Sequence, residues 1–154
     1  MDKIDKNILS IIQKNASVPL TELTKKIGIS STPCWNRIKK MEEEGIISSR
    51  VTVVDNNKIN LPIIVFLSFS ISSHSEEWLN NFKEIIKKYD QIIEVYRLTG
   101  SSTDYLLKIV APSIKQYDSF QQEIIKHIKF NKMSSSIALK ELKKSNFLPL
   151  DFVV

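Results

Sequence analysis

The sequence contains very little cysteine, histidine, glycine or proline. Among its 154 residues there are one cysteine, two histidines, three glycines and five prolines. The single cysteine, Cys34, excludes an internal disulfide framework and a multi-cysteine zinc site. His74 and His127 lie far apart in the sequence, and neither has a second ligand at the spacing of a metal site. The glycines stand singly, so no phosphate-cradling loop is formed. The sequence therefore predicts neither an enzyme nor a metal centre, and no cofactor.

The chain also has no long apolar run and no apolar leader. The longest apolar stretch, Leu61 to Leu67, is far shorter than the roughly 20 residues of a membrane span. Met1 to Lys6 alternate charged residues with Ile4, unlike a secretory leader. We therefore expect a soluble, cytoplasmic protein with no membrane partner.

Charge and apolar content are those of a globular protein. The chain is 42% hydrophobic and has 22 Lys and Arg against 17 Asp and Glu, a net charge of +5. The apolar content is enough for one compact domain or two small ones. The positive excess is a mild bias toward polyanionic partners.

Three helices are predicted in the first 44 residues. Asp2 suits a helix N-cap, and isoleucines at positions 4, 8, 11 and 12 form one apolar stripe. A short helix follows over residues 19–27 and ends at Gly28, a residue that tolerates the left-handed conformation of a helix end. Ser30 offers the next N-cap, for a helix from Ser31 to Glu44. Residues 46–54 alternate polar and apolar side chains, which predicts a strand or wing.

The third helix carries the candidate nucleic-acid contacts. Cys34, Ile38 and Met41 share one face, which we expect to be buried. Two helices joined by a tight turn, with a basic outer face on the second, describe a helix-turn-helix, whose recognition helix enters the major groove. The candidate DNA contacts are Ser31, Thr32, Trp35, Asn36, Arg37, Lys39, Lys40 and, in the following segment, Arg50. Arg37 is the leading single candidate. Two alternatives stay open: a merely solvated charged face, and packing of Trp35 against the first helix.

These segments resemble the Lrp/AsnC family, the leucine-responsive or feast/famine group of prokaryotic transcription regulators. The likeness lies in residues 1–9, 30–42 and 45–47, and continues through Thr99-Gly100, residues 104–108 and residues 141–146. It covers nearly the whole chain in the right order, and it strengthens the expectation of double-stranded DNA as a partner.

The second half predicts a ferredoxin-like domain. Strand, helix, strand, strand, helix and strand follow one another from Ile63 onward, the βαββαβ order of that fold with its antiparallel sheet. The fold class is therefore α+β, with a winged helix-turn-helix over residues 1–54, a linker over 55–62 and the ferredoxin-like domain over 63–154. Ile64 and Phe66 make the sheet face away from the helices partly apolar, which predicts a two-fold homodimer. The family resemblance implies the same domain, and larger assemblies of dimers such as an octamer.

The resemblance also implies an amino-acid effector site in the second domain. Family members usually carry Gly-Asp-x-Asp between the two central strands. The corresponding residues here are Gly100, Ser101, Ser102, Thr103 and Asp104, which lack the first acid. Losing that carboxylate removes a partner for an effector's ammonium group, whereas the hydroxyls retain hydrogen-bonding capacity for a carboxylate. The alternative is an ordinary polar turn.

The leading interpretation is a sequence-specific DNA-binding transcription regulator that dimerises, or assembles further, and responds to an amino acid or related metabolite. An architectural DNA-compacting protein with low sequence preference is one alternative. A metabolite-binding oligomer without DNA function is another.

Overall fold

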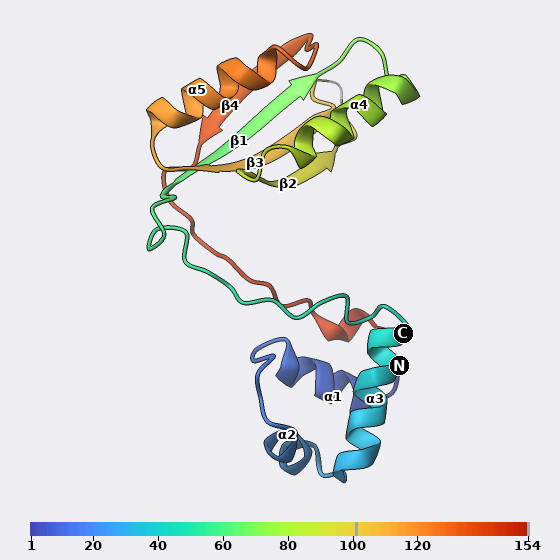
Figure 1. The fold of residues 1–154 in the computed structure, drawn as a ribbon. Coiled ribbons are helices and arrows are strands. Elements are labelled where there is room, and N and C mark those ends of the chain that lie inside the picture. Colours follow the sequence, from blue (N-terminus) through green and yellow to red (C-terminus); the bar gives the residue numbers. More distant parts are fainter. Residues whose placement is uncertain (101, 154) are drawn as a thin grey trace. The chain divides into compact units, whose positions relative to one another are not determined.

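The structure is a computed structural model that describes residues 1–100 and 102–153, and the chain divides into two compact units (Figure 1). Unit 1 combines Met1–Val53 with Lys143–Val154, and unit 2 is Val54–Leu142. No described helix is both long enough and apolar enough to cross a membrane.

Unit 1 contains the three predicted helices, α1 (Lys3–Ile12), α2 (Leu20–Ile27) and α3 (Ser31–Glu43). Helix α1 begins with a reciprocal cap, in which the Asp5 amide donates to Asp2 Oδ1 at 2.9 Å and the Asp2 amide donates to Asp5 Oδ2 at 3.0 Å. Helix α2 ends at Gly28, whose φ of 80° is left-handed as predicted. The core of unit 1 contains Ile8, Leu9, Leu23, Cys34, Ile38 and Met41.

The end of the chain, Lys143–Val154, groups with unit 1, whereas the sequence prediction assigned residues 63–154 to the second domain. Leu150, in the short 3-10 helix Leu150–Phe152, packs against the core of unit 1. Gln13 holds both backbone groups of Leu148: its Oε1 accepts from the amide at 2.8 Å and its Nε2 donates to the carbonyl at 3.4 Å. Lys6 Nζ donates to the carbonyl of Val153 at 2.6 Å. These partners come from helix α1 and its C-cap residue Gln13, so no local sequence pattern predicts the contact.

The strand predicted over residues 46–54 does not form. The structure assigns neither helix nor strand to residues 48–54, and Val51 and Val53 are 71% and 61% exposed. Of the predicted strand or wing, the strand was wrong, because alternation becomes a strand only where another strand supplies the hydrogen bonds. Within the described residues this segment has no such partner.

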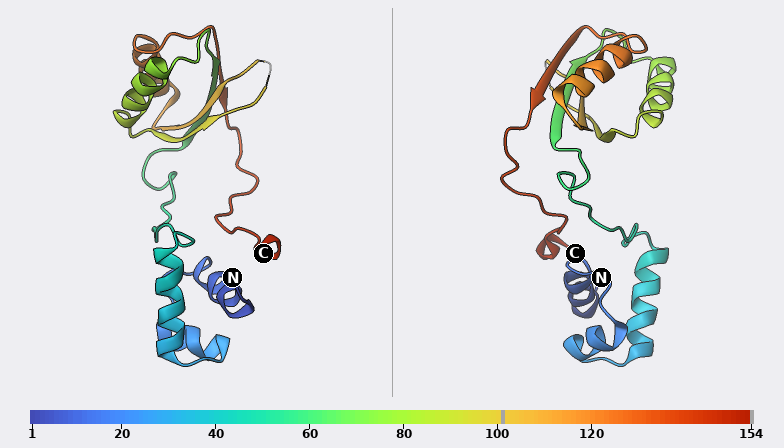
Figure 2. Two further views of the ribbon diagram at one scale, coloured as in Figure 1. Left: turned by 90° about the vertical axis from the view of Figure 1, so that its right-hand side faces the viewer. Right: turned by 60° about the vertical axis from the view of Figure 1, so that its left-hand side comes forward.

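Unit 2 has the predicted ferredoxin-like arrangement. Its elements are β1 (Ile63–Ser70), α4 (Glu76–Lys87), β2 (Ile92–Arg97), β3 (Tyr105–Ala111), α5 (Ile114–Ile125) and β4 (Lys132–Ile137). The strands form one antiparallel sheet in the order β2-β3-β1-β4, with Leu67 of β1 opposite Leu107 of β3 and Ser135 of β4. Both helices cover the same face of this sheet (Figure 2).

The core of unit 2 lies between the sheet and these helices. Val65, Leu67 and Phe69 alternate along β1 toward the helices and are almost fully buried. Phe69 packs edge-on against Phe82 of α4, with ring centroids 5.7 Å apart. The helices thereby cover one apolar face, and the opposite face remains open in the single chain.

Candidate nucleic-acid interface

Helix α3 presents a defined outer face because its inner face is anchored. Cys34, Ile38 and Met41 are buried at 0%, 4% and 3% exposure. Burial raises the pKa of the Cys34 thiol above its usual value, which keeps it protonated and inert. With these three side chains held inward, the residues on the opposite side of the helix point outward.

The outer face carries most of the predicted contacts. The predicted contacts of α3 that are exposed form a set that we call the α3 outer face: Ser31, Thr32, Trp35, Asn36, Lys39 and Lys40. Trp35 is 47% exposed and is not among the residues of the unit 1 core, which favours an outward position over packing on the first helix. The Ser30 side chain makes no capping hydrogen bond, so the amide groups of Ser31 and Thr32 remain available to an anion, whereas Pro33 has no amide N–H.

Trp35, Lys39, Glu42 and Arg50 form a continuous polar and aromatic cluster. Lys39 Nζ lies 4.7 Å from the centre of the Trp35 ring and 2.9 Å from Glu42 Oε2. Arg50 Nη2 lies 3.0 Å from the other oxygen, Glu42 Oε1. The hydrogen bond from Lys39, followed by the charges of Lys39 and Arg50, holds the pKa of Glu42 below its usual value. Lys39 and Arg50 therefore share Glu42 as a partner, and the sequence interpretation did not include this acid.

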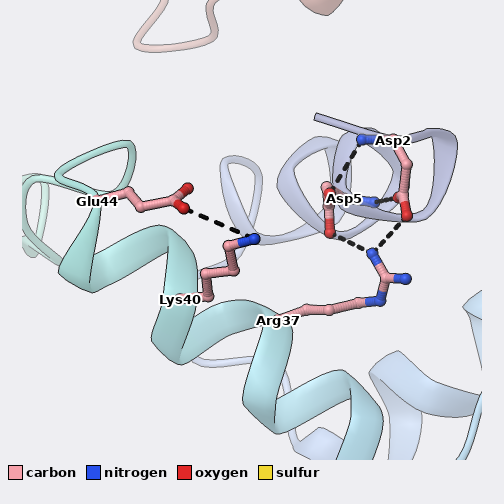
Figure 3. Close-up of polar contacts among 5 residues, drawn as sticks. All are labelled: Asp2, Asp5, Arg37, Lys40 and Glu44. Carbon is pink, nitrogen blue, oxygen red and sulfur yellow. Dashed lines mark hydrogen bonds and ion pairs between the residues drawn. The ribbon is translucent and has the colours of Figure 1, made fainter.

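Arg37, the leading candidate from the sequence, is directed toward helix α1. Its Nη1 lies 2.6 Å from Asp2 Oδ2 and 2.7 Å from Asp5 Oδ1 (Figure 3). The two carboxylates raise the pKa of Arg37 still further. The Asp5 amide, and then Arg37, hold the pKa of Asp2 below its usual value. Lys40, one turn from Arg37, is 3.7 Å from Glu44 and is 73% exposed at its side chain.

In unit 2 the predicted effector residues Gly100, Ser102, Thr103 and Asp104 lie between β2 and β3, and Ser101 lies outside the described residues. Both carboxylate oxygens of Asp104 have partners within unit 2. Its Oδ2 accepts from the Ile71 amide at 2.8 Å, and its Oδ1 is 3.4 Å from His74 Nε2.

Beside this loop is an open hollow of about 440 Å³. It is lined by Ser68, Phe69, Ser102, Thr103, Lys132, Met133 and Ser134. The sequence interpretation missed the lining from β1 and β4, because only the pairing of those strands brings Lys132 opposite Ser70 and Ser134 opposite Ser68. Among the described residues, no group of three or more metal-ligating side chains could hold an ion.

Two family profiles match the chain. Residues 1–48 match the winged helix-turn-helix DNA-binding profile, and residues 64–148 match the Lrp/AsnC ligand binding domain. Over 150 residues the chain is 39% identical to the glutamate uptake regulatory protein of Zymomonas mobilis, across 97% of this chain and 91% of that protein.

Solved structures agree. The crystal structure of an AsnC family transcriptional regulator from Agrobacterium tumefaciens is 42% identical, with a TM-score of 0.94 over the whole of both chains. A transcriptional regulator from Neisseria meningitidis, solved in complex with L-methionine, is 28% identical, with a TM-score of 0.93 over 100% of this chain and 99% of that one.

A helix-turn-helix domain followed by this ligand-binding domain defines a DNA-binding transcription regulator, not an enzyme. The chain belongs to the Lrp/AsnC family, as its sequence resemblance predicted.

Proposed function

We propose that the chain reads specific operators with the α3 outer face. The observation that carries this proposal is that one side of α3 is exposed while Cys34, Ile38 and Met41 on the other side are buried in the core. The exposed residues are Thr32, Trp35, Asn36, Lys39 and Lys40. The Asn36 amide has the donor and acceptor pair that suits adenine, and the lysines suit phosphates or guanine. The Ser31 and Thr32 amide groups at the start of α3 suit a phosphate.

A dimer would present two such helices to two half-sites. The sheet face opposite α4 and α5 supports this proposal, because it carries Ile64, Phe66, Leu106 and Val110, and Phe66 is 37% exposed in the single chain. We expect Phe66→Lys to produce monomers in sedimentation experiments. Ile125→Lys is the matched control, since Ile125 is 38% exposed but lies on α5. Larger rings of dimers, such as an octamer, would follow the family pattern.

The hollow beside residues 100–104 is the proposed effector site, for an amino acid or a related metabolite of the cytoplasm. Its support is the L-methionine complex of the Neisseria relative and the hollow's own chemistry. Lys132 would pair with a carboxylate, and the hydroxyls of Ser68, Ser102 and Ser134 would accept or donate hydrogen bonds.

The described lining residues include no carboxylate that could pair with the ammonium group of an amino-acid effector. We therefore expect a specificity that differs from leucine sensing. Tight leucine binding in calorimetry that survives both Ser101→Ala and Ser102→Ala would contradict this.

The operator proposal is tested by fluorescence anisotropy with DNA from upstream of the chain's own gene and a scrambled duplex, at about 0.15 M salt, where non-specific binding is typically no tighter than 10⁻⁶ M. We expect a preference of a hundredfold or more. Lys40→Gln should weaken binding to both duplexes. Lys87→Gln is the control, because both lysines are exposed and paired with a nearby glutamate but Lys87 lies in unit 2.

Equal, weak binding to both duplexes would favour an architectural role. No binding by the wild-type chain would favour a metabolite-binding oligomer. Either result would overturn the operator proposal.

A further inference from the structure

We propose that Arg37 is a positioning residue that sets the orientation of the recognition helix through helix α1, and that it does not bind DNA. This inference rests on the proposed reading of DNA by α3. It reverses the role that the sequence alone suggests for Arg37, since a cation in the middle of a recognition helix is an obvious candidate for phosphate or guanine.

Two carboxylates from helix α1 and its cap hold the guanidinium. One nitrogen, Nη1, is within 2.7 Å of a carboxylate oxygen from each of Asp2 and Asp5. The same two aspartates close the reciprocal cap of α1 through each other's amide groups. The cap and the guanidinium therefore form one polar cluster, in which Asp5 is the most covered member, with 18% of its side chain exposed.

This cluster adds direction to the packing of α3 on α1. The remaining contact between the two helices is apolar, with Ile8 and Leu9 in the same core as Cys34 and Ile38. Apolar burial is not directional, so it permits small rotations of α3 about its axis. Two charge-assisted hydrogen bonds have fixed lengths and directions and remove that freedom. Trp35 and Asn36 immediately precede Arg37, so a rotation there displaces them.

The surrounding charge also disfavours a phosphate at Arg37. A phosphate that approached Arg37 would also approach Asp2 and Asp5, and it would have to displace them from the guanidinium. By contrast, Lys40 has a single carboxylate partner among the described residues, at 3.7 Å, and is the more exposed cation. The DNA-facing charge of this part of α3 is therefore that of Lys40.

Asp5→Asn separates the two roles, because they predict opposite signs. If Arg37 positions α3 through Asp5, the Asp5→Asn chain should bind its operator on the order of tenfold more weakly, as should Arg37→Gln. The double variant should be no weaker than either single one. If Arg37 instead binds DNA, Asp5→Asn releases it, and operator binding should become tighter.

The salt dependence provides a readout that a loss of stability would not change. We expect Lys40→Gln to reduce the slope of log K against log salt by about 0.9, the value of one phosphate contact. Arg37→Gln should leave the slope unchanged while it lowers the preference for operator over scrambled DNA. A reduced slope in Arg37→Gln would overturn the proposal.

Circular dichroism and thermal unfolding of each full-length variant identify any failure to fold. Should Arg37→Gln not fold, the sign of the Asp5→Asn effect still decides between the two roles. Failure of the wild-type chain to bind operator would instead contradict the proposed function.

Discussion

Glu42 restrains two cations of the proposed DNA face, and its replacement by glutamine should tighten operator binding. The carboxylate is 2.9 Å from Lys39 and 3.0 Å from Arg50, and its lowered pKa keeps it ionised at neutral pH. Glu42→Gln removes one negative charge and releases both cations. Each additional ion pair with a phosphate changes log K by about 0.9 per unit of log salt, which is about fivefold at 0.15 M. One or two such pairs therefore predict about 5- to 30-fold tighter binding.

The assay is an anisotropy titration of wild type and variant on one operator duplex between about 50 and 200 mM salt. Glu43→Gln is the matched control, because it makes the same charge change on the next residue. Within the described residues Glu43 is exposed and has no ion-pair partner. Its effect measures the general loss of repulsion. If Glu42→Gln binds no more tightly than Glu43→Gln, or has the wild-type salt slope, Glu42 does not restrain the two cations.

Four further predictions concern stability. Gly28→Ala places a side chain at a φ of 80° and should destabilise unit 1 by about 1–2 kcal/mol, seen as a lower Tm, with a smaller loss for Gly28→Asn. Phe69→Ala removes an almost fully buried ring and should lower the free energy of unfolding of unit 2 by about 3–5 kcal/mol in urea titrations. Leu150→Ala truncates a half-buried side chain on the unit 1 core and should cost about 1–2 kcal/mol, whereas a loss within error would show that the end of the chain does not support this unit. The pKa of Asp2 is lowered in the folded chain, so its contribution is present at pH 7 and is lost as the pH falls below about 4, and melts of Asp2→Asn should converge with wild type in acid.

The local features of the fold could be predicted from the sequence. Isoleucines at helical spacing after Asp2, the glycine after α2 and the Cys34, Ile38 and Met41 face are signals within a few residues, and all three appear in the structure. The ferredoxin-like order was predictable for the same reason, since each strand and helix has its own apolar period.

The features that the sequence did not reveal all depend on distant partners. The prediction of a strand over 46–54 was wrong because an alternating pattern does not specify a partner strand. The end of the chain joins unit 1 through Gln13 and Leu148, which are 135 residues apart. Arg37 finds its carboxylates 32 and 35 residues earlier, in a segment where Asp2 and Asp5 already have a local role as a helix cap. The residue type at an exposed helix position therefore predicts the charge of the side chain, but it does not predict which partner that side chain contacts.

That distinction bears on the source of DNA affinity. Each of the four cations proposed from the sequence as a DNA contact has a carboxylate partner in the chain: Arg37 has Asp2 and Asp5, Lys39 and Arg50 share Glu42, and Lys40 has Glu44. Binding to a phosphate must therefore replace one ion pair by another, and a net charge of +5 overstates the attraction available to DNA. This replacement gains little free energy on non-specific DNA, where the lysines meet phosphates in no fixed geometry. It would become favourable where the proposed base contacts from Trp35 and Asn36 fix the helix in the groove, and where the second helix of the proposed dimer binds at the same time. If α3 reads DNA as proposed, its ion pairs favour specific over non-specific binding.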